Sequence, residues 1–276
     1  MVENAGTLDA KVALLHEILS KLEGGALVAF SGGADSALLA AEAHAALGPG
    51  CVLFTADSPS LPRAELEQAR AFAERRGVRL EVRQTQELGD PRYAANDALR
   101  CYYCKGALFD SMAAAARELG LRWLLFGAND DDQGDWRPGQ KAAFERGGRA
   151  PLLEAGFTKA DVRERSRQLG LETWDKPSAA CLSSRFPSGM PITIQHLGKV
   201  ERAEDVLRSL GFRQCRVRLM GDSARIEVEV DELPKFADAD LRRRAVEALK
   251  GFGFRFVTLD LEGFRSGSLN PPRQEA

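Results

Sequence analysis

The sequence predicts an α/β protein built on a parallel sheet, followed by a smaller α+β domain. Short, continuous apolar runs alternate with helical patterns over the first half of the chain, which is typical of parallel strands covered on both faces. After about residue 190 the pattern changes to two alternating strands around Gly221-Asp222, with helices on either side. We therefore expect domains at 1–189 and 190–270 and a disordered tail at 271–276.

The elements of the first half follow one another closely. Helices are expected where apolar residues recur at helical spacing or Ala and Leu dominate, and glycines mark several of their ends. The expected helices are 8–22, 36–47, 64–76, a long Ala-rich helix ending near Gly120, and 158–169. The expected strands are the apolar runs 26–30, 51–55, 78–82 and 123–126.

Two polar segments interrupt this pattern. Residues 127–148 are rich in Gly and Asp, and 176–191 contain three prolines and several serines. We expect a long active-site loop with little regular structure in the first segment and another loop in the second. The small domain should then contain helix 194–210, strands 213–219 and 225–230, helix 239–251 and strand 254–259.

Composition limits the partners of the chain. The 38 basic and 40 acidic residues give a net charge of -2, which argues against a general nucleic-acid surface. The N-terminal segment carries charges throughout and does not have the pattern of a signal peptide. No stretch approaches the roughly 18 apolar residues that a membrane helix needs. We expect a cytoplasmic protein with neither nucleic acid nor membrane as a partner.

The segment SGGADS, between the first strand and the next helix, has the composition of a phosphate-binding loop. Glycines let the backbone approach a phosphate, and the N–H groups of the turn and helix N-terminus face the anion. Serine hydroxyls add donors, and Asp35 can hold Mg²⁺ between phosphates. The alternative is an ordinary capped turn, but the whole pattern favours phosphate binding by Ser31, Gly32, Gly33, Asp35 and Ser36.

A second polar segment, FGANDDD at 126–132, follows the fourth strand. Ligands of open α/β sheets bind at the carboxyl ends of strands. Asn129 and Asp130 are therefore expected beside the nucleotide, with the carboxylates as candidates for completing a magnesium site. A solvated acidic loop is the alternative.

An odd number of cysteines argues against a disulfide framework in this chain; they are Cys51, Cys101, Cys104, Cys181 and Cys215. Cys51 and Cys215 are expected in the cores of strands. Cys101 and Cys104 form a CxxC, and Cys181 lies in the second polar segment. Three thiolates fit a 4Fe-4S cluster with one open iron better than zinc, whose structural sites take four ligands.

Cys181 is the strongest candidate for a reactive thiol. It lies in the loop sequence KPSAACLSSR, between serines and near Lys176 and Arg185. Neighbouring cations favour a thiolate, which is the nucleophilic form.

Taken together, these motifs resemble known families. SGGADS resembles the PP-loop of ATP pyrophosphatases (adenine nucleotide alpha hydrolase-like proteins), which include GMP synthetases, NAD synthetases and tRNA thiolation enzymes; in these, the loop holds the departing pyrophosphate. SGGADS, RCYYCK, FGANDDD, the run 150–159 and KPSAACLSSRFPSG occur here in the order of the LarE family. Those are ATP-dependent sulfur transferases that make the pincer cofactor of nickel-dependent lactate racemase. The resemblance covers roughly residues 10–260, and CLSSR is its most specific part.

The resemblance implies a reaction. ATP adenylates a carboxylate of pyridinium-3,5-biscarboxylic acid mononucleotide, a thiolate displaces AMP, and cleavage of the Cβ–S bond leaves a thiocarboxylate. Members with one cysteine sacrifice it and retain dehydroalanine. Members with a CxxC and the loop cysteine hold a 4Fe-4S cluster that carries an extra sulfide. Because this chain has Cys101, Cys104 and Cys181, we favour the cluster route, with sacrifice of Cys181 as the alternative.

The substrate phosphate requires cations. Arg216 and Arg218 alternate on an expected strand, which places both guanidinium groups on one face. The family's phosphate-binding arginines match this R-x-R, and a solvated strand face is the alternative. The resemblance also places Ser184 and Arg185 near the substrate, and Glu204 stands about where the family has an acidic helix residue. It further implies a homo-oligomer, with a hexamer as the candidate.

Two other functions remain as alternatives. PP-loop enzymes that thiolate tRNA share the loop and a three-cysteine site, but the slightly acidic charge and the lack of further CxxC pairs argue against that function. A regulatory module that binds AMP without chemistry is the other, and the intact SGGADS together with a loop cysteine argues against it.

Overall fold

A computed structural model describes residues 6–132, 137–177, 180–265 and 268–269. The chain divides into two compact units: the first comprises Met1–Glu87 and Cys101–Ala179, the second Leu88–Arg100 and Ala180–Ala276. The expected domains 1–189 and 190–270 stay a prediction, because this division does not measure which segments fold independently. The expected disordered tail 271–276 lies outside the described residues.

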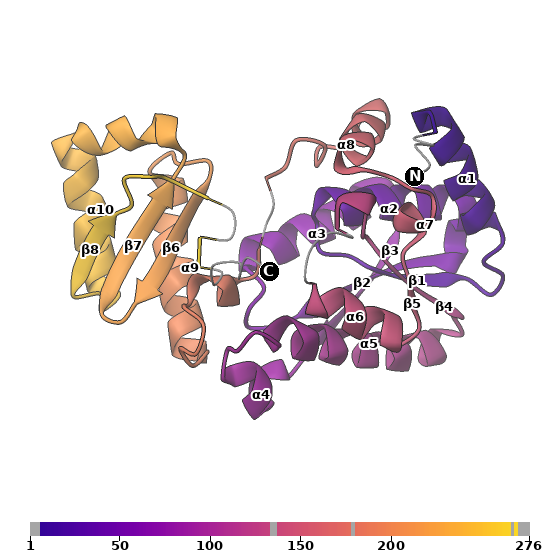
Figure 1. The fold of residues 1–276 in the computed structure, drawn as a ribbon, viewed down its shortest axis with the longest axis horizontal. Coiled ribbons are helices and arrows are strands. Elements are labelled where there is room, and N and C mark those ends of the chain that lie inside the picture. Colours follow the sequence, from indigo (N-terminus) through magenta and orange to yellow (C-terminus); the bar gives the residue numbers. More distant parts are fainter. Residues whose placement is uncertain (1–5, 133–136, 178–179, 266–267, 270–276) are drawn as a thin grey trace, which may run out of the picture. The chain divides into compact units, whose positions relative to one another are not determined.

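The first unit is built on a five-stranded parallel sheet, as predicted (Figure 1). Its strands run in the order β3-β2-β1-β4-β5, and all four pairings are parallel. Four of the five strands lie where the apolar runs placed them, and the fifth was not foreseen. Their bounds are β1 Ala26–Ala29, β2 Cys51–Asp57, β3 Arg79–Gln84, β4 Trp123–Phe126 and β5 Gly148–Arg149.

Both faces of this sheet are buried. Val28 and Phe30 belong to one hydrophobic cluster, and Leu27 and Ala29 belong to the other, because successive side chains of a strand point to opposite faces. The first cluster includes residues of α1 (Leu8–Ser20), α2 (Ala34–Leu47), α3 (Arg63–Arg76), α7 (Pro151–Glu154) and α8 (Lys159–Gln168). The second includes α5 (Arg100–Leu119) and α6 (Pro138–Glu145). Within the described residues, no helix is long and apolar enough to span a membrane.

The prediction of little regular structure in 127–148 is wrong in part, because α6 and the start of β5 lie there. The buried residues of α6 include Gly139, Ala142 and Ala143, which are too small to produce an apolar periodicity. They let the helix lie close to α5: a Cβ on Gly139 would come within 2.9 Å of Lys105 Cγ and 3.3 Å of the Cys101 carbonyl oxygen.

The second unit contains a small mixed sheet in the order β6-β7-β8, consistent with the predicted smaller α+β fold. β6 (Cys215–Met220) and β7 (Ser223–Val228) form an antiparallel hairpin, and Gly221 turns the chain at a φ of +60°. Helix α10 (Ala239–Gly251) leads to β8 (Phe256–Leu259), which is parallel to β7. Helix α9 (Ile194–Ser209) contacts β6. The unit also includes the short helix α4 (Pro91–Ala94).

Gly198 provides a test of helix packing. It lies inside α9, where an added Cβ would meet open space. Gly198→Ala should raise the free energy of unfolding by about 0.5–1 kcal/mol, since alanine loses less backbone entropy in a helix. Gly139→Ala in α6 is the matched control and should destabilise the protein, because its Cβ has no space. Urea unfolding measures both changes, and destabilisation by Gly198→Ala would contradict the packing of α9.

Candidate active site

The SGGADS segment forms the turn between β1 and α2. Gly32 has a φ of +72°, a conformation that favours glycine. The Ser36 hydroxyl donates to the Gly33 carbonyl at 3.0 Å and accepts the Ser31 N–H at 3.3 Å. In this described turn, the N-cap Gly33 offers no side-chain acceptor to α2. The first N–H groups of α2 therefore suit the oxygens of an anionic ligand, and phosphate binding by this turn stays a prediction.

The segment after β4 meets the same loop. Asn129 is buried, and its Nδ2 donates to Asp35 Oδ1 at 2.8 Å. Burial raises the pKa of Asp35, and the hydrogen bond from Asn129 opposes that rise. Asn129 Oδ1 is buried without a hydrogen-bond partner in the described part of the chain. The approach is close at Gly127, where a Cβ would lie 2.8 Å from the Ser36 nitrogen.

The three aspartates after Asn129 have different surroundings. Asp131 accepts the backbone N–H of Lys159, at the start of α8, at 2.6 Å. Asp132 is buried and pairs with Arg137 at 2.8 Å, so the alternative of a wholly solvated acidic loop is wrong. The side chain of Asp130 is exposed. Among the described residues, no three His, Cys, Asp or Glu side chains gather closely enough to hold a metal ion. Asp35 and Asp130 remain the candidates for a magnesium site.

The five cysteines fall into two groups, and none of them, all within the described residues, is in a disulfide. Cys51 and Cys215 begin β2 and β6 and are buried, as predicted. Burial raises the pKa of each thiol to about 12. Cys101 and Cys104 lie in the first turn of α5, three residues apart and hence on the same side of the helix. Cys101 is exposed, and Cys104 and Cys181 are half-buried, so these are the accessible thiols.

In the second unit, Arg185 organises the chain around Cys181. The guanidinium group is buried, and its Nη1 donates to the carbonyls of Ala180 and Cys181 at 2.9 and 3.1 Å. Its Nε and Nη2 donate to the two carboxylate oxygens of Glu204 at 2.7 and 3.0 Å. The expectation that Arg185 acts on the thiol finds no support in these contacts, because the guanidinium group contacts oxygens of the protein.

Glu204 is the centre of this buried charge. Its side chain has an exposed fraction of 0% and also accepts the Val217 N–H at 3.1 Å. Burial acts to raise the pKa of Glu204, but the charges of Arg185 and Arg216 and the hydrogen bonds outweigh it and hold the pKa below the ordinary 4.5. The carboxylate is therefore ionised at neutral pH, and it links α9 to β6.

Arg216 and Arg218 both lie on β6 and are buried, so the alternative of a solvated strand face is wrong. Arg218 pairs with buried Glu227 at 2.7 Å and donates to the Ser184 carbonyl at 2.8 Å. Arg216 donates to the Cys215 carbonyl at 2.8 Å. Burial, and then the charge of Arg185, lower the pKa of Arg216 to about 10.

Sequence reasoning missed the segment 88–100, which belongs to the second unit. Tyr93 Oη lies 2.6 Å from Ser183 Oγ, and Asn96 Nδ2 donates to the Pro187 carbonyl at 2.8 Å. Arg100 donates to the Ser183 carbonyl at 2.8 Å. These contacts join segment 88–100 to the CLSSR segment and the residues after it, about 90 residues further along the chain. Only the tertiary fold shows them. Glu227 was also missed, although it faces Arg216 in the hairpin register.

The sheet, the SGGADS loop at the end of β1 and the adjoining Asn129 define a PP-loop protein of the ATP-pyrophosphatase type with a smaller mixed-sheet unit. No protein-family model matches the chain. It is 38% identical to pyridinium-3,5-bisthiocarboxylic acid mononucleotide synthase of Lactiplantibacillus plantarum, over 96% of this chain and 95% of the relative. The chain therefore belongs to the LarE family, as its motifs predicted.

Two uncharacterized proteins are also similar. One, from Synechocystis sp., is 46% identical over 95% of this chain and 98% of its own length. The other, from Methanocaldococcus jannaschii, is 28% identical over 87% of this chain and 90% of its own length. All three similarities extend through both units of the chain.

Glu204→Gln tests the buried pair. It should lower the free energy of unfolding by about 3–5 kcal/mol, because it leaves Arg185 buried without its counter-charge. Asp205→Asn, at the next position of α9, is the control: Asp205 pairs with Arg208 at the surface, and its loss should cost no more than about 1 kcal/mol. Urea unfolding at neutral pH measures both.

The same pair makes stability depend on pH. Because the pKa of Glu204 in the folded protein lies below 4.5, its stabilisation is complete above the unfolded pKa and is lost as the pH falls through the folded pKa. Glu204→Gln should remove that part of the acid dependence. An unchanged pH profile in this variant would show that the pair does not carry it.

Proposed function

We propose that this protein is an ATP-dependent sulfur transferase that adenylates a carboxylate of pyridinium-3,5-biscarboxylic acid mononucleotide and converts it to a thiocarboxylate, in biosynthesis of the nickel-pincer cofactor of lactate racemase. The observation that carries the proposal is the 38% identity to the bisthiocarboxylic acid mononucleotide synthase over 96% of the chain. The proposal includes a cytoplasmic location and a homo-oligomer, for which a hexamer is the candidate.

The first unit would bind the nucleotide. N–H groups of the SGGADS turn and of the first turn of α2 would bind the departing pyrophosphate. Mg²⁺ takes oxygen ligands, and Asp35, Asp130 and the unpartnered Asn129 Oδ1 are oxygen donors of the right kind. When bound, Mg²⁺ would neutralise charge between the phosphates. Asn129 would hold the Asp35 carboxylate in place for this role.

The second unit would bind the substrate phosphate. Three buried arginines, Arg185, Arg216 and Arg218, lie in this unit with two buried carboxylates, Glu204 and Glu227, and guanidinium groups are suited to binding phosphate. The lowered pKa of Arg216 supports this residue as the principal phosphate ligand. Arg218 and Arg185 would hold Ser184 and the backbone at Cys181 in position.

Cys101, Cys104 and Cys181 would supply the sulfur chemistry. The contrast with buried Cys51 and Cys215 supports them, because these three thiols are accessible. Thiolates are the usual ligands of a 4Fe-4S cluster, so the donor set fits such a group, which would supply a labile sulfide. The sacrificial route through Cys181 alone is the alternative. No contact among the described residues and no relative favours tRNA thiolation or a module without chemistry.

The direct test uses anaerobically purified protein with MgATP, the biscarboxylic acid mononucleotide and sulfide. We expect AMP and pyrophosphate to form together with a product whose mass corresponds to replacement of oxygen by sulfur. AMP formation that requires tRNA in place of the mononucleotide would overturn the proposal.

Asp35→Ala should lower the rate of AMP formation by about 100-fold or more, since it removes a group beside the developing charge of pyrophosphate. Quantifying AMP in single-turnover reactions measures the effect. Asp131→Ala is the control, because Asp131 contacts the start of α8; it should lower stability and leave the rate of AMP formation nearly unchanged. Normal turnover by Asp35→Ala would remove this residue from the site.

Arg216→Ala should raise the KM for the mononucleotide far more than that for ATP. Loss of one charge-assisted contact with the phosphate should cost about 1.5–3 kcal/mol of binding. Arg218→Ala should show the same selectivity and also lower stability, because Glu227 loses a buried partner. Steady-state kinetics for both substrates measure this, and equal effects on the two KM values would assign these arginines a structural role.

The two sulfur routes predict different effects of the cysteine substitutions. Under the cluster route, replacing Cys101, Cys104 or Cys181 by Ala should abolish the iron–sulfur absorption and the multiple turnovers fed by sulfide. Cys51→Ala is the control and should retain both. Under the sacrificial route only Cys181→Ala stops transfer, and the wild-type chain loses the mass of one hydrogen sulfide. We expect the cluster outcome, measured by iron analysis and intact mass, and a colourless, active protein with that mass loss would refute it.

A further inference from the structure

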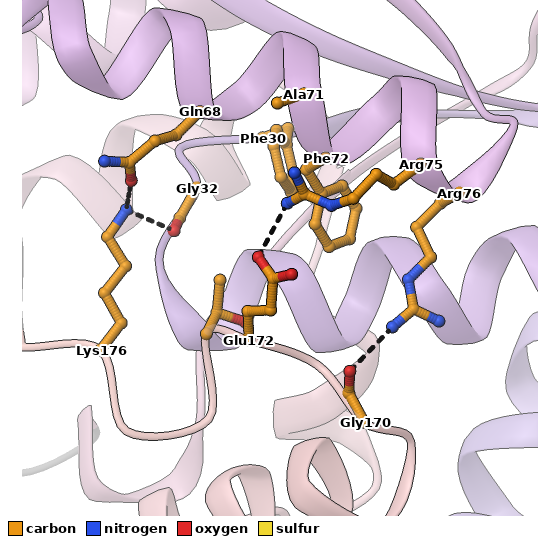
Figure 2. A pocket seen from close by; sticks show the side chains of 11 residues that line it. Phe30, Gly32, Gln68, Ala71, Phe72, Arg75, Arg76, Gly170, Glu172 and Lys176 are labelled. Atoms are coloured by element: carbon orange, nitrogen blue, oxygen red, sulfur yellow. Dashed lines mark hydrogen bonds and ion pairs between the residues drawn. The ribbon is translucent and has the colours of Figure 1, made fainter.

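Lys176 makes three contacts beside the SGGADS turn, and Figure 2 shows the two with Gly32 and Gln68. Its Nζ donates to the Gly32 carbonyl at 3.0 Å, to Glu65 Oε2 at 2.6 Å and to Gln68 Oε1 at 2.7 Å. Glu65 and Gln68 lie three residues apart on α3 and so share one side of that helix. An ammonium group has three N–H donors, and each has an acceptor here. We call Lys176, Glu65 and Gln68 the lysine anchor.

The lysine anchor joins three separate parts of the first unit. It connects the turn after β1, the first half of α3, and the segment that follows α8. The side chains of Lys176 and Glu65 are 17% and 15% exposed, so water competes weakly with these contacts. Lys176 and Gln68 line a cavity of about 420 Å³, together with residues such as Phe30, Phe72 and Thr173.

The carbonyl that Lys176 holds belongs to the peptide that joins Gly32 to Gly33. Gly32 has a φ of +72°, and its carbonyl shares a planar trans peptide with the Gly33 N–H. In such a peptide the C=O and the N–H point in opposite directions. A contact that fixes the Gly32 carbonyl toward Lys176 therefore fixes the Gly33 N–H away from it.

We propose that Lys176 is a positioning residue that presets the SGGADS turn for the phosphates of ATP, and that it acts through the Gly32 carbonyl. This inference rests on the proposed use of ATP by that turn. An N–H donor that is already oriented before the anion binds strengthens the binding, because the turn does not have to reorganise. The three donors of the ammonium group are occupied and its charge is paired with Glu65, which argues against direct contact with phosphate.

A substitution of Gln68 distinguishes a positioning role of Lys176 from direct phosphate binding by Lys176, because Gln68 is the uncharged part of the lysine anchor. Lys176→Met keeps the aliphatic stem and removes the amine, and it should weaken MgATP binding about ten-fold. Gln68→Met removes one acceptor without changing the charge, and it should weaken MgATP binding about three-fold by loosening the amine. If Lys176 bound phosphate directly, Gln68→Met would release it and binding would stay equal or tighten.

Arg75→Met is the matched control. Arg75 also ties α3 to the segment after α8, through Glu172 at 3.0 Å, and within the described part of the chain it makes no hydrogen bond or ion pair with the turn. It should leave MgATP binding unchanged. Isothermal titration calorimetry with MgATP gives the affinities, and thermal unfolding gives the stability of each variant. The KM for the mononucleotide at saturating ATP should stay unchanged in Lys176→Met, whereas a merely structural role would weaken both ligands alike.

The outcomes separate this inference from the proposed function. Failure of the wild-type protein to bind MgATP would contradict the proposed function. Wild-type protein that binds MgATP, with Lys176→Met binding equally well, would overturn the inference alone. So would equal or tighter binding by Gln68→Met, which would make Lys176 a direct ligand. Weaker binding by both variants, with Arg75→Met unchanged, is the expected result.

Discussion

The parallel pairing of β1 with a neighbour on each side is the constraint on which the nucleotide site depends. Ala29, at the end of β1, is in register with Phe54 of β2 and Phe126 of β4. The chain leaves β1 toward β2 and leaves β4 toward β5, on opposite sides of the sheet, and at such a point open α/β sheets bind ligands at the carboxyl ends of their strands. Asp35 and Asn129 meet there although 94 residues separate them. A shift of register by one residue would turn every β1 side chain to the opposite face. The two hydrophobic layers and the site therefore depend on the same register.

Under the proposed function, the two units would bind anions by different physical means. The first would use backbone N–H groups of a turn and a helix, which are dipoles and need no counter-charge when they are buried. The second would use guanidinium groups, and burying a charge requires a partner. Glu204 and Glu227 are these partners, because each is fully buried and forms an ion pair with an arginine. The SGGADS loop can therefore consist of small residues, whereas the second unit carries a network of ion pairs.

Sequence patterns predicted what depends on local periodicity and composition. The runs around Val28 and Leu125 gave the strands because buried parallel strands are apolar on both faces. Helix α6 was not predicted, because its buried residues include small ones such as Gly139. The buried state of Arg216 could not be read from alternation, since the same pattern describes a solvated strand. Its partners come from α9 and from the hairpin register, which exist only in the folded chain.

The arginines of the second unit also show why residue type alone does not define a role. Arg185 contacts two carbonyls, a hydroxyl and both oxygens of a carboxylate. A lysine, with a compact charge and three donors, could not span that set, so the shape of the turn around Cys181 requires arginine there. Arg216 differs, because its surroundings disfavour its charge. A buried charge that its surroundings disfavour would gain from an added anion, which is the physical basis of the phosphate-binding role proposed for Arg216.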